Sequence, residues 1–140
     1  MKSSNFTLSR HDINRLKPLL LQMEYRHGDA LPIHLLRLAS QMDVCNKVDP
    51  PKVPADVVTM NSRVLLQDPA SKAKFEYELV FPIDAEPLEG RISVLTPMGA
   101  AMLGARLYQS VDVSTSSRRQ KKLVVREIVF QPEAAGRYDL

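Results

Sequence analysis

Two stretches near the start of the chain carry apolar residues at the spacing of a helix. The stripes are formed by Ile13, Leu16, Leu20 and Met23 in the first stretch and by Leu35, Leu38, Met42 and Cys45 in the second. In both, the apolar positions are separated by three, four and three residues, which places them on one helix face. The pattern predicts two amphipathic helices, each with one buried stripe.

The residues around these stripes indicate where the helices begin and end. We expect Ser9 to cap the first helix, with Asp12 in its first turn. Pro18 lacks a backbone donor, so the helix is expected to kink or restart there. Gly28 breaks the first helix and Pro32 suits the first turn of the second. The result is a short antiparallel helical hairpin with arms of about 22 Å, at 1.5 Å per residue.

A proline-rich segment, NKVDPPKVPA (46–55), follows the second helix. Its three prolines are incompatible with a helix or a central strand. We therefore divide the chain into residues 1–52, a helical hairpin with its linker, and residues 53–140, a second structural part.

The second part reads as a sheet with one short helix. Strand-like runs occupy residues 57–68, 74–81, 91–95, 109–115 and 122–130. In KFEYELVF (74–81), Phe75, Tyr77, Leu79 and Phe81 share one face, while Glu76 and Glu78 share the other. TPMGAAMLG (96–104) opens with proline, ends with glycine and predicts a short helix whose small residues pack closely on the sheet. The class is α+β, with about five antiparallel strands.

Composition is ordinary for a globular protein: 140 residues, 44% hydrophobic and 25% charged. There is no apolar run of membrane-spanning length and no secretory signal, and Cys45 is the only cysteine. A cytoplasmic location with a buried, inert thiol is expected. Residues 1–52 contain eight Lys/Arg and five Asp/Glu, a net charge of +3, whereas residues 53–140 contain eleven of each, a net charge of 0. This excess is too small to predict nucleic-acid binding.

No catalytic or metal-binding arrangement emerges from the sequence. TPMGAAMLG lacks the Lys and Ser/Thr of a phosphate-binding loop. His11, His27 and His34 are scattered without partners at metal-ligand spacing, and Glu76 and Glu78 lie on a solvated strand face. We predict a protein without enzymatic activity, cofactor, metal or small-molecule substrate.

Charged residues are most concentrated in one basic turn, which contains Arg118, Arg119, Lys121 and Lys122. The turn has no interleaved aromatic residues, so base stacking is not supported. A solvated hairpin turn is the simplest interpretation; an acidic protein surface or a weak contact with a nucleic-acid backbone is the alternative.

Three segments carry a resemblance to a known family: VVTMNSRV (57–64), ISVLTPMGAAMLG (92–104) and FQPEAAG (130–136). Together they resemble the regulator of nucleoside diphosphate kinase (Rnk) family, relatives of the bacterial transcript-cleavage factors GreA and GreB. The resemblance covers almost the whole chain. It implies a C-terminal domain of FKBP-like fold behind a shortened N-terminal coiled coil.

The same resemblance implies a partner. Family members bind core RNA polymerase at the rim of its secondary channel, and the Gre relatives use a loop before the short helix for this contact. Its counterpart here is Thr96, Pro97 and Met98. Packing alone remains the alternative explanation for Pro97 and Met98.

Gre factors also carry acidic residues at the tip of a long coiled coil, where they help hold a catalytic magnesium ion. The corresponding hairpin tip here contains Glu24, Tyr25, Arg26, His27 and Asp29. The two acids are interspersed with basic residues, and the arms are several turns shorter. The resemblance therefore implies competition with Gre factors for the channel without transcript cleavage.

Two departures from the Gre pattern fall on loops: Tyr108-Gln109-Ser110 after the short helix, and SSRRQKK in place of a Gly-rich hairpin turn.

Two other functions stay open. An FKBP-like fold suggests a prolyl isomerase, but the chain has no Trp and only eight Phe and Tyr to build a pocket. The family name suggests action on nucleoside diphosphate kinase or on its expression.

Overall fold

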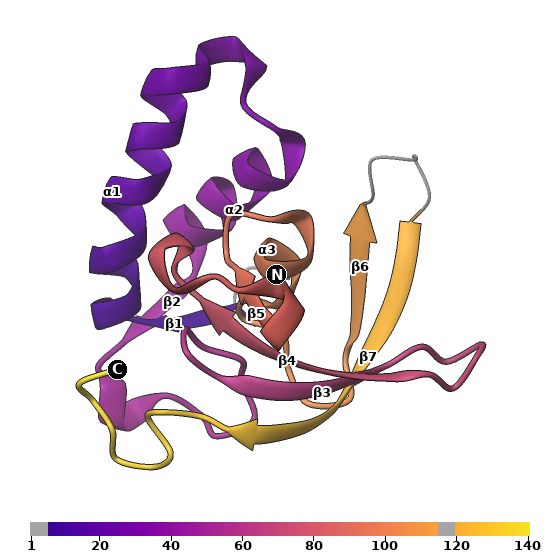
Figure 1. The fold of residues 1–140 in the computed structure, drawn as a ribbon. Helices are drawn as coiled ribbons and strands as arrows, with labels where there is room; N and C mark the ends of the chain where they lie inside the picture. Colours follow the sequence, from indigo (N-terminus) through magenta and orange to yellow (C-terminus); the bar gives the residue numbers. More distant parts are fainter. Residues whose placement is uncertain (1–5, 115–119) are drawn as a thin grey trace.

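A curled five-stranded sheet and two N-terminal helices make up most of the fold (Figure 1). The structure is a computed structural model that describes residues 6–114 and 120–140. The helices are α1 (Arg10–His27), α2 (Ile33–Val44) and α3 (Pro97–Met102). The strands are β1 (Thr7–Ser9), β2 (Asn46–Val48), β3 (Arg63–Gln67), β4 (Lys74–Val80), β5 (Arg91–Ser93), β6 (Ser110–Ser114) and β7 (Gln120–Phe130). The mixed α and β content confirms the predicted class.

Helix α1 begins and ends where the sequence indicates. The Ser9 hydroxyl oxygen accepts a hydrogen bond from the Asp12 amide at 3.0 Å, and Gly28 ends the helix with a φ of 54°. The helix does not restart at Pro18, because α1 is one continuous helix of 18 residues that runs through this position. The alternative, a kink at Pro18, stays a prediction. Pro18 and Asn14 are both exposed. Water can therefore hydrate the Asn14 carbonyl that the proline leaves without a helical partner.

Both predicted apolar stripes face the interior. The buried members are Ile13, Leu16 and Leu20 in α1 and Leu35, Leu38 and Met42 in α2. In Figure 1, α1 rises to the top of the molecule, the chain turns back there, and α2 descends. Pro32 is the residue just before α2, one position earlier than expected.

The sheet has the strand order β5-β4-β3-β7-β6 and is not wholly antiparallel. The pairs β3–β4, β3–β7 and β6–β7 are antiparallel as predicted, but β5 runs parallel to β4. Residues 81–90 cause the difference, because two 3-10 turns in this loop carry the chain back alongside β4 before β5 starts. The alternation of β4 predicts its buried Leu79 and exposed Glu76 correctly, although Val80 is also buried.

Only the second half of the predicted strand 57–68 belongs to the sheet. Residues Thr59–Ser62 form a tight turn: the Ser62 hydroxyl accepts from the Thr59 amide at 3.0 Å, and Asn61 has a φ of 66°. Asparagine tolerates this left-handed conformation better than most residues. The sequence also misses the small parallel pair β1–β2, because three-residue strands show no periodicity.

A buried polar network joins the Thr59–Ser62 turn to α1 and to the C-terminal segment. The Asp12 carboxylate accepts from the Met60 amide at 3.1 Å and from the Arg15 guanidinium at 2.6 Å. On the other side of the turn, the Thr59 hydroxyl donates to Glu133 at 2.7 Å. Asp12, Thr59 and Glu133 are all buried. The turn is thus held by a carboxylate from each end of the chain.

One buried cluster includes residues from both sides of the proposed boundary at residue 52, among them Leu16, Leu38, Val58 and Leu79. The division into residues 1–52 and 53–140 stays a prediction. Among the described helices, none has both the length and the apolar character that crossing a bilayer requires.

The buried Glu133 gives the first prediction. Burial raises the pKa of Glu133 above its ordinary value, against the lowering effect of the Thr59 hydrogen bond. The folded chain therefore binds this proton more tightly than the unfolded chain. Its stabilising contribution is complete below the unfolded pKa of about 4.5 and is lost as pH rises through the folded pKa. Glu133→Gln should become more stable relative to the natural chain as pH rises.

Urea unfolding of both chains from pH 4.5 to pH 8 measures this effect. Glu89→Gln, which removes the same charge from an exposed side chain, is the matched control and should follow the natural chain. If the stability difference between Glu133→Gln and the natural chain stayed constant across this range, the proposed desolvation of Glu133 would be contradicted.

Candidate functional site

The segment before α3 is fixed in place by its own hydrogen bonds. The Thr96 hydroxyl accepts from the Gly99 amide at 3.0 Å and donates to the Ser93 carbonyl oxygen at 2.7 Å. Thr96 therefore caps α3, and Pro97 occupies the first helical position, where a missing N–H costs nothing. Pro97 and Met98 are half-buried, and Met98 packs against the core. This segment is held by hydrogen bonds and is partly accessible.

Gly99 lets α3 approach the preceding strand closely. A Cβ atom at this position would collide with the backbone carbonyl of Ser93. A shift of the Ser93 carbonyl would disturb the hydrogen bond that this oxygen accepts from the Thr96 hydroxyl. The close approach of α3 to β5 therefore requires glycine at position 99, as expected for a helix of small residues packed on the sheet.

Helix α2 is fixed to the same segment through His34. The His34 ring donates from Nε2 to the Leu95 carbonyl oxygen over 2.7 Å. The sequence gives no indication of this contact, which joins residues 61 positions apart. It aligns α2 beside α3 and orients the surface that both present.

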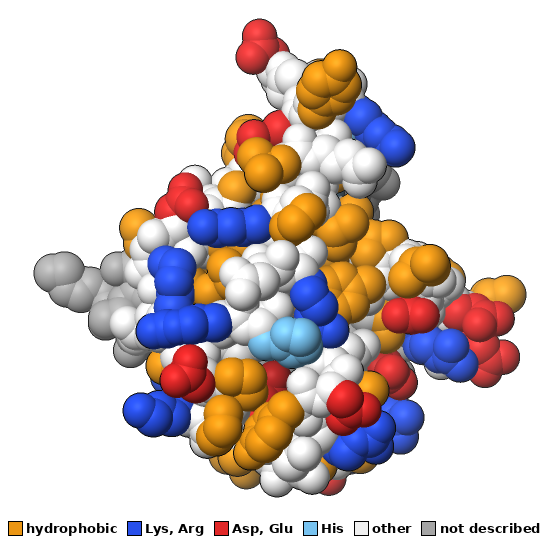
Figure 2. Space-filling model, turned by 90° about the vertical axis from the view of Figure 1, so that its left-hand side faces the viewer, with side chains coloured by type: hydrophobic (Ala, Val, Ile, Leu, Met, Phe, Trp, Pro, Cys, Tyr) orange, Lys and Arg blue, Asp and Glu red, His pale blue; other side chains and the backbone are white. Residues whose placement is uncertain are grey.

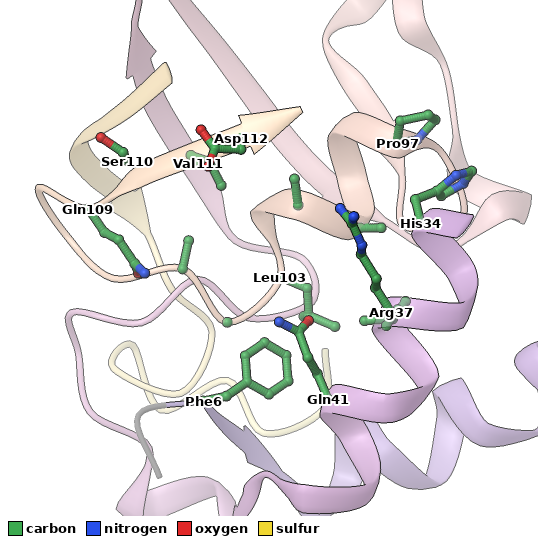
Figure 3. Close-up of a pocket in the computed structure, with 15 residues that line it drawn as sticks. Phe6, His34, Arg37, Gln41, Pro97, Leu103, Gln109, Ser110, Val111 and Asp112 are labelled. Atoms are coloured by element: carbon green, nitrogen blue, oxygen red, sulfur yellow. The ribbon is translucent and has the colours of Figure 1, made fainter. Parts of the chain in front are cut away.

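A groove lies between α2, α3 and β6, with a cavity of about 240 Å³ (Figure 3). Arg37 and Gln41 of α2 line one side, Ser110–Asp112 of β6 the other, and Ala100 and Ala101 of α3 lie between them. Pro97 is at one end of this groove and Phe6 at the other. The predicted contact residue Pro97 thus belongs to a concave surface that extends well beyond its loop.

The predicted hairpin-tip residues lie at the top of the molecule, apart from α3 (Figure 1). Glu24, Tyr25, Arg26, His27 and Asp29 are all exposed, and Tyr25 is 90% exposed. Acidic, basic and hydrophobic side chains are mixed on this tip (Figure 2). Within residues 6–114 and 120–140, there is no group of three or more His, Cys, Asp or Glu placed to hold a metal ion.

Half of the predicted basic turn lies outside the described residues, namely Arg118 and Arg119. Lys122 is exposed. The Lys121 ammonium lies over the Phe75 ring, 4.7 Å from its centroid, so part of this charge is engaged with the sheet.

The other residues considered for chemistry have structural roles. Cys45 is buried, and burial raises the pKa of its thiol, which disfavours the reactive thiolate. Glu78 is 3.4 Å from the Arg63 guanidinium across the β3–β4 pair, and Glu76 is exposed. These charges form an ordinary solvated sheet face.

Sequence reasoning named Pro97 as a partner contact, which stays a prediction, and it did not single out the polar residues on the two walls of the groove. Arg37, Gln41 and Asp112 come from two elements distant in sequence and follow no motif, so only the tertiary arrangement brings them together. One departure from the Gre pattern, Tyr108, did mark an unusual backbone position near the groove. Its φ of 69° lies in the left-handed region that favours glycine. Tyr108 is also 68% exposed. Its bulky ring therefore projects from the loop that leads into β6.

Comparisons with known proteins identify the family of this chain. Residues 53–129 match the family model described as "Transcription elongation factor, GreA/GreB, C-term". The "Regulator of nucleoside diphosphate kinase" of Escherichia coli (strain K12) is 35% identical over 127 residues, which cover 91% of this chain and 90% of that protein. GreA of Clostridium botulinum (strain Alaska E43 / Type E3) is 30% identical over 79 residues, 56% of this chain and 49% of that protein.

A solved structure is similar over nearly the full length. The "Prokaryotic transcription elongation factor GreA/GreB from Nitrosomonas europaea" superposes with a TM-score of 0.75 at 28% identity, covering 89% of this chain and 99% of that one. The chain therefore belongs to the regulator of nucleoside diphosphate kinase family, related to GreA and GreB through its C-terminal part.

The packing of Gly99 gives a prediction that separates its role from helix propensity. Gly99→Ala should destabilise the fold by about 1–3 kcal/mol or more, because the collision with Ser93 outweighs the gain of about 1 kcal/mol in helix propensity. Ala101→Gly in the same helix is the comparison, and it should lower the free energy of unfolding by about 1 kcal/mol. Thermal and urea unfolding measure both. A Gly99→Ala protein as stable as the natural chain would contradict the close approach of α3 to β5.

Proposed function

We propose that this member of the family is a non-catalytic regulator of transcription that docks on core RNA polymerase at the rim of its secondary channel. Family membership supports the coarser statement, a regulator related to transcription elongation factors. The finer statement rests on the segment Thr96–Met98, which resembles the polymerase-contacting loop of Gre factors. In this chain the segment is held by the α3 cap and is partly accessible.

Pro97 is the residue of this segment best suited to contact a partner. The Thr96 hydroxyl is already engaged on both sides by Gly99 and Ser93, and Met98 packs on the core. Pro97 has no backbone donor to satisfy, and it lies at the end of the groove between α2 and β6. A rigid apolar ring at a groove end is a favourable anchor, since little conformational entropy is lost on binding.

The helical part supports occupancy of the channel without cleavage. We interpret α1 and α2 as a truncated antiparallel coiled coil (residues 1–52) in front of an FKBP-like domain (residues 53–140). Helix α1 is about 27 Å long for its 18 residues. Its tip offers Glu24 and Asp29 together with Arg26 and His27, which disfavours the concentration of negative charge that a magnesium ion requires. Such a protein would compete with Gre factors for the same channel.

The printed name of the Escherichia coli relative favours a second candidate, a regulator that acts on nucleoside diphosphate kinase or on its expression. The two candidates predict different partners. Binding to the purified kinase, without binding to the polymerase, would favour direct action on the kinase.

Pro97→Asp provides the test of the docking surface. An aspartate at the first helical position is compatible with α3, since a negative charge there is favoured by the helix dipole. The free energy of unfolding should therefore change by less than about 1 kcal/mol. Binding to core polymerase should weaken by about tenfold or more, as expected when an apolar anchor is replaced by a charge. Co-sedimentation or fluorescence anisotropy with purified core polymerase measures the affinity.

Leu88→Asp is the matched control, because Leu88 is fully exposed in the loop before β5 and the substitution is equally drastic in chemistry. It should leave polymerase binding unchanged. If Pro97→Asp bound as tightly as the natural chain, the docking surface would be wrongly placed. A large loss of stability in Pro97→Asp would show that Pro97 acts through packing.

A further inference from the structure

The groove between α2 and β6 has a feature that the docking of Pro97 does not use. β6 is the last strand of the sheet, with β7 on one side and no strand on the other among the described residues. No hydrogen bond beyond the β6–β7 ladder engages the backbone of residues 111–113 within the described part of the chain. An edge strand of this kind presents unpaired N–H and C=O groups that can pair with another chain.

The edge of β6 opens into the groove. Successive side chains of a strand point to opposite faces of the sheet, yet Ser110, Val111 and Asp112 all line the same cavity. Three consecutive residues can do so because the cavity borders the edge of the strand. Val111 is buried toward the floor, whereas Asp112 is exposed and points to the other side of the strand (Figure 3).

The opposite wall carries an uncompensated positive charge. Arg37 and Gln41 are exposed on α2 and line the groove. Within residues 6–114 and 120–140, neither side chain has a hydrogen bond or an ion pair, whereas Arg15, Arg63 and Arg106 each have an acidic partner. The Arg37 side chain extends from α2 toward the space between α3 and β6 (Figure 3). It is placed to meet an acidic group inside the groove.

The size and floor of the groove indicate what kind of molecule fits. Its cavity of about 240 Å³ is below the roughly 300–1,000 Å³ of small-molecule sites. Small side chains, among them Ala100 and Ala101, line the groove beside the larger buried Leu38 and Leu103. The small side chains leave room for those of an incoming segment. An open groove with a free strand edge is the arrangement used when a peptide adds a strand to a sheet.

We propose that this groove binds an extended segment of a partner protein, which pairs with β6 and places an acidic side chain beside Arg37. Backbone hydrogen bonds to the β6 edge supply the affinity, and Arg37 selects for acidic segments. The inference concerns the form of the bound segment. It does not depend on the identity of the partner, polymerase or other.

Titration of the full-length chain with a synthetic peptide tests the proposal. The probe is acetyl-VTETV-amide, whose two valines and glutamate share one face when the peptide is extended. Amide chemical shifts in nitrogen-proton correlation spectra should move at Ser110–Val113 and around Arg37. Arg37→Glu should weaken this binding by about fivefold, the upper range for an exposed ion pair. The lysine peptide acetyl-VTKTV-amide should in turn prefer the Arg37→Glu chain.

Two controls make the test specific. Arg26→Glu introduces the same charge change at the exposed hairpin tip and should leave the affinity for the glutamate peptide unchanged. A glutamate peptide with methylated internal nitrogens retains its side chains but cannot pair with β6, and it should not bind. The inference is overturned if no shifts appear at millimolar peptide, if they fall outside the groove, or if the methylated peptide binds equally. No polymerase is present, so failure here would leave the proposed function to its own test.

Discussion

The fold depends on the turn at Thr59–Ser62, because two separate parts of the chain are held to it by buried carboxylates. Asp12 of α1 accepts from the Met60 amide, and Glu133 of the C-terminal segment accepts from Thr59. Breaking either contact would leave a charged or polar group buried without a partner, which typically costs about 1–3 kcal/mol or more. These contacts therefore fix the relative arrangement of the helices, the sheet and the C-terminal segment. The groove between α2 and β6 depends on this arrangement.

This arrangement separates the residues that hold the fold from those that can meet a partner. Two of the segments that carry the family resemblance, VVTMNSRV (57–64) and FQPEAAG (130–136), bind each other. The Thr59 hydroxyl donates to Glu133, and the Gln131 side-chain amide donates to the Val57 carbonyl oxygen at 2.7 Å. Their role in this chain is structural. The accessible chemistry lies elsewhere, at Pro97 and along the groove, where side chains have few internal partners.

The sequence predicts elements that contain a long periodic pattern. It does not predict features set by the path of a loop or by contacts between residues far apart in the sequence. The stripes of α1 and α2 and the alternation of β4 are long patterns, and the structure confirms them. The parallel placement of β5 was not predictable, since it depends on the path of the loop 81–90. The resemblance gave Thr96–Met98, but no local pattern relates Arg37 to β6, because the His34 contact that orients α2 joins distant positions.

The most direct test of the central claim is a competition experiment on purified core RNA polymerase. The chain is bound at micromolar concentration, and a Gre factor is then added in increasing amounts. If the chain occupies the secondary channel through its α3 segment, the Gre factor should displace it completely, with a midpoint that shifts in proportion to the concentration of the chain. Simultaneous binding of both proteins, or no binding of the chain to the polymerase at all, would contradict the account.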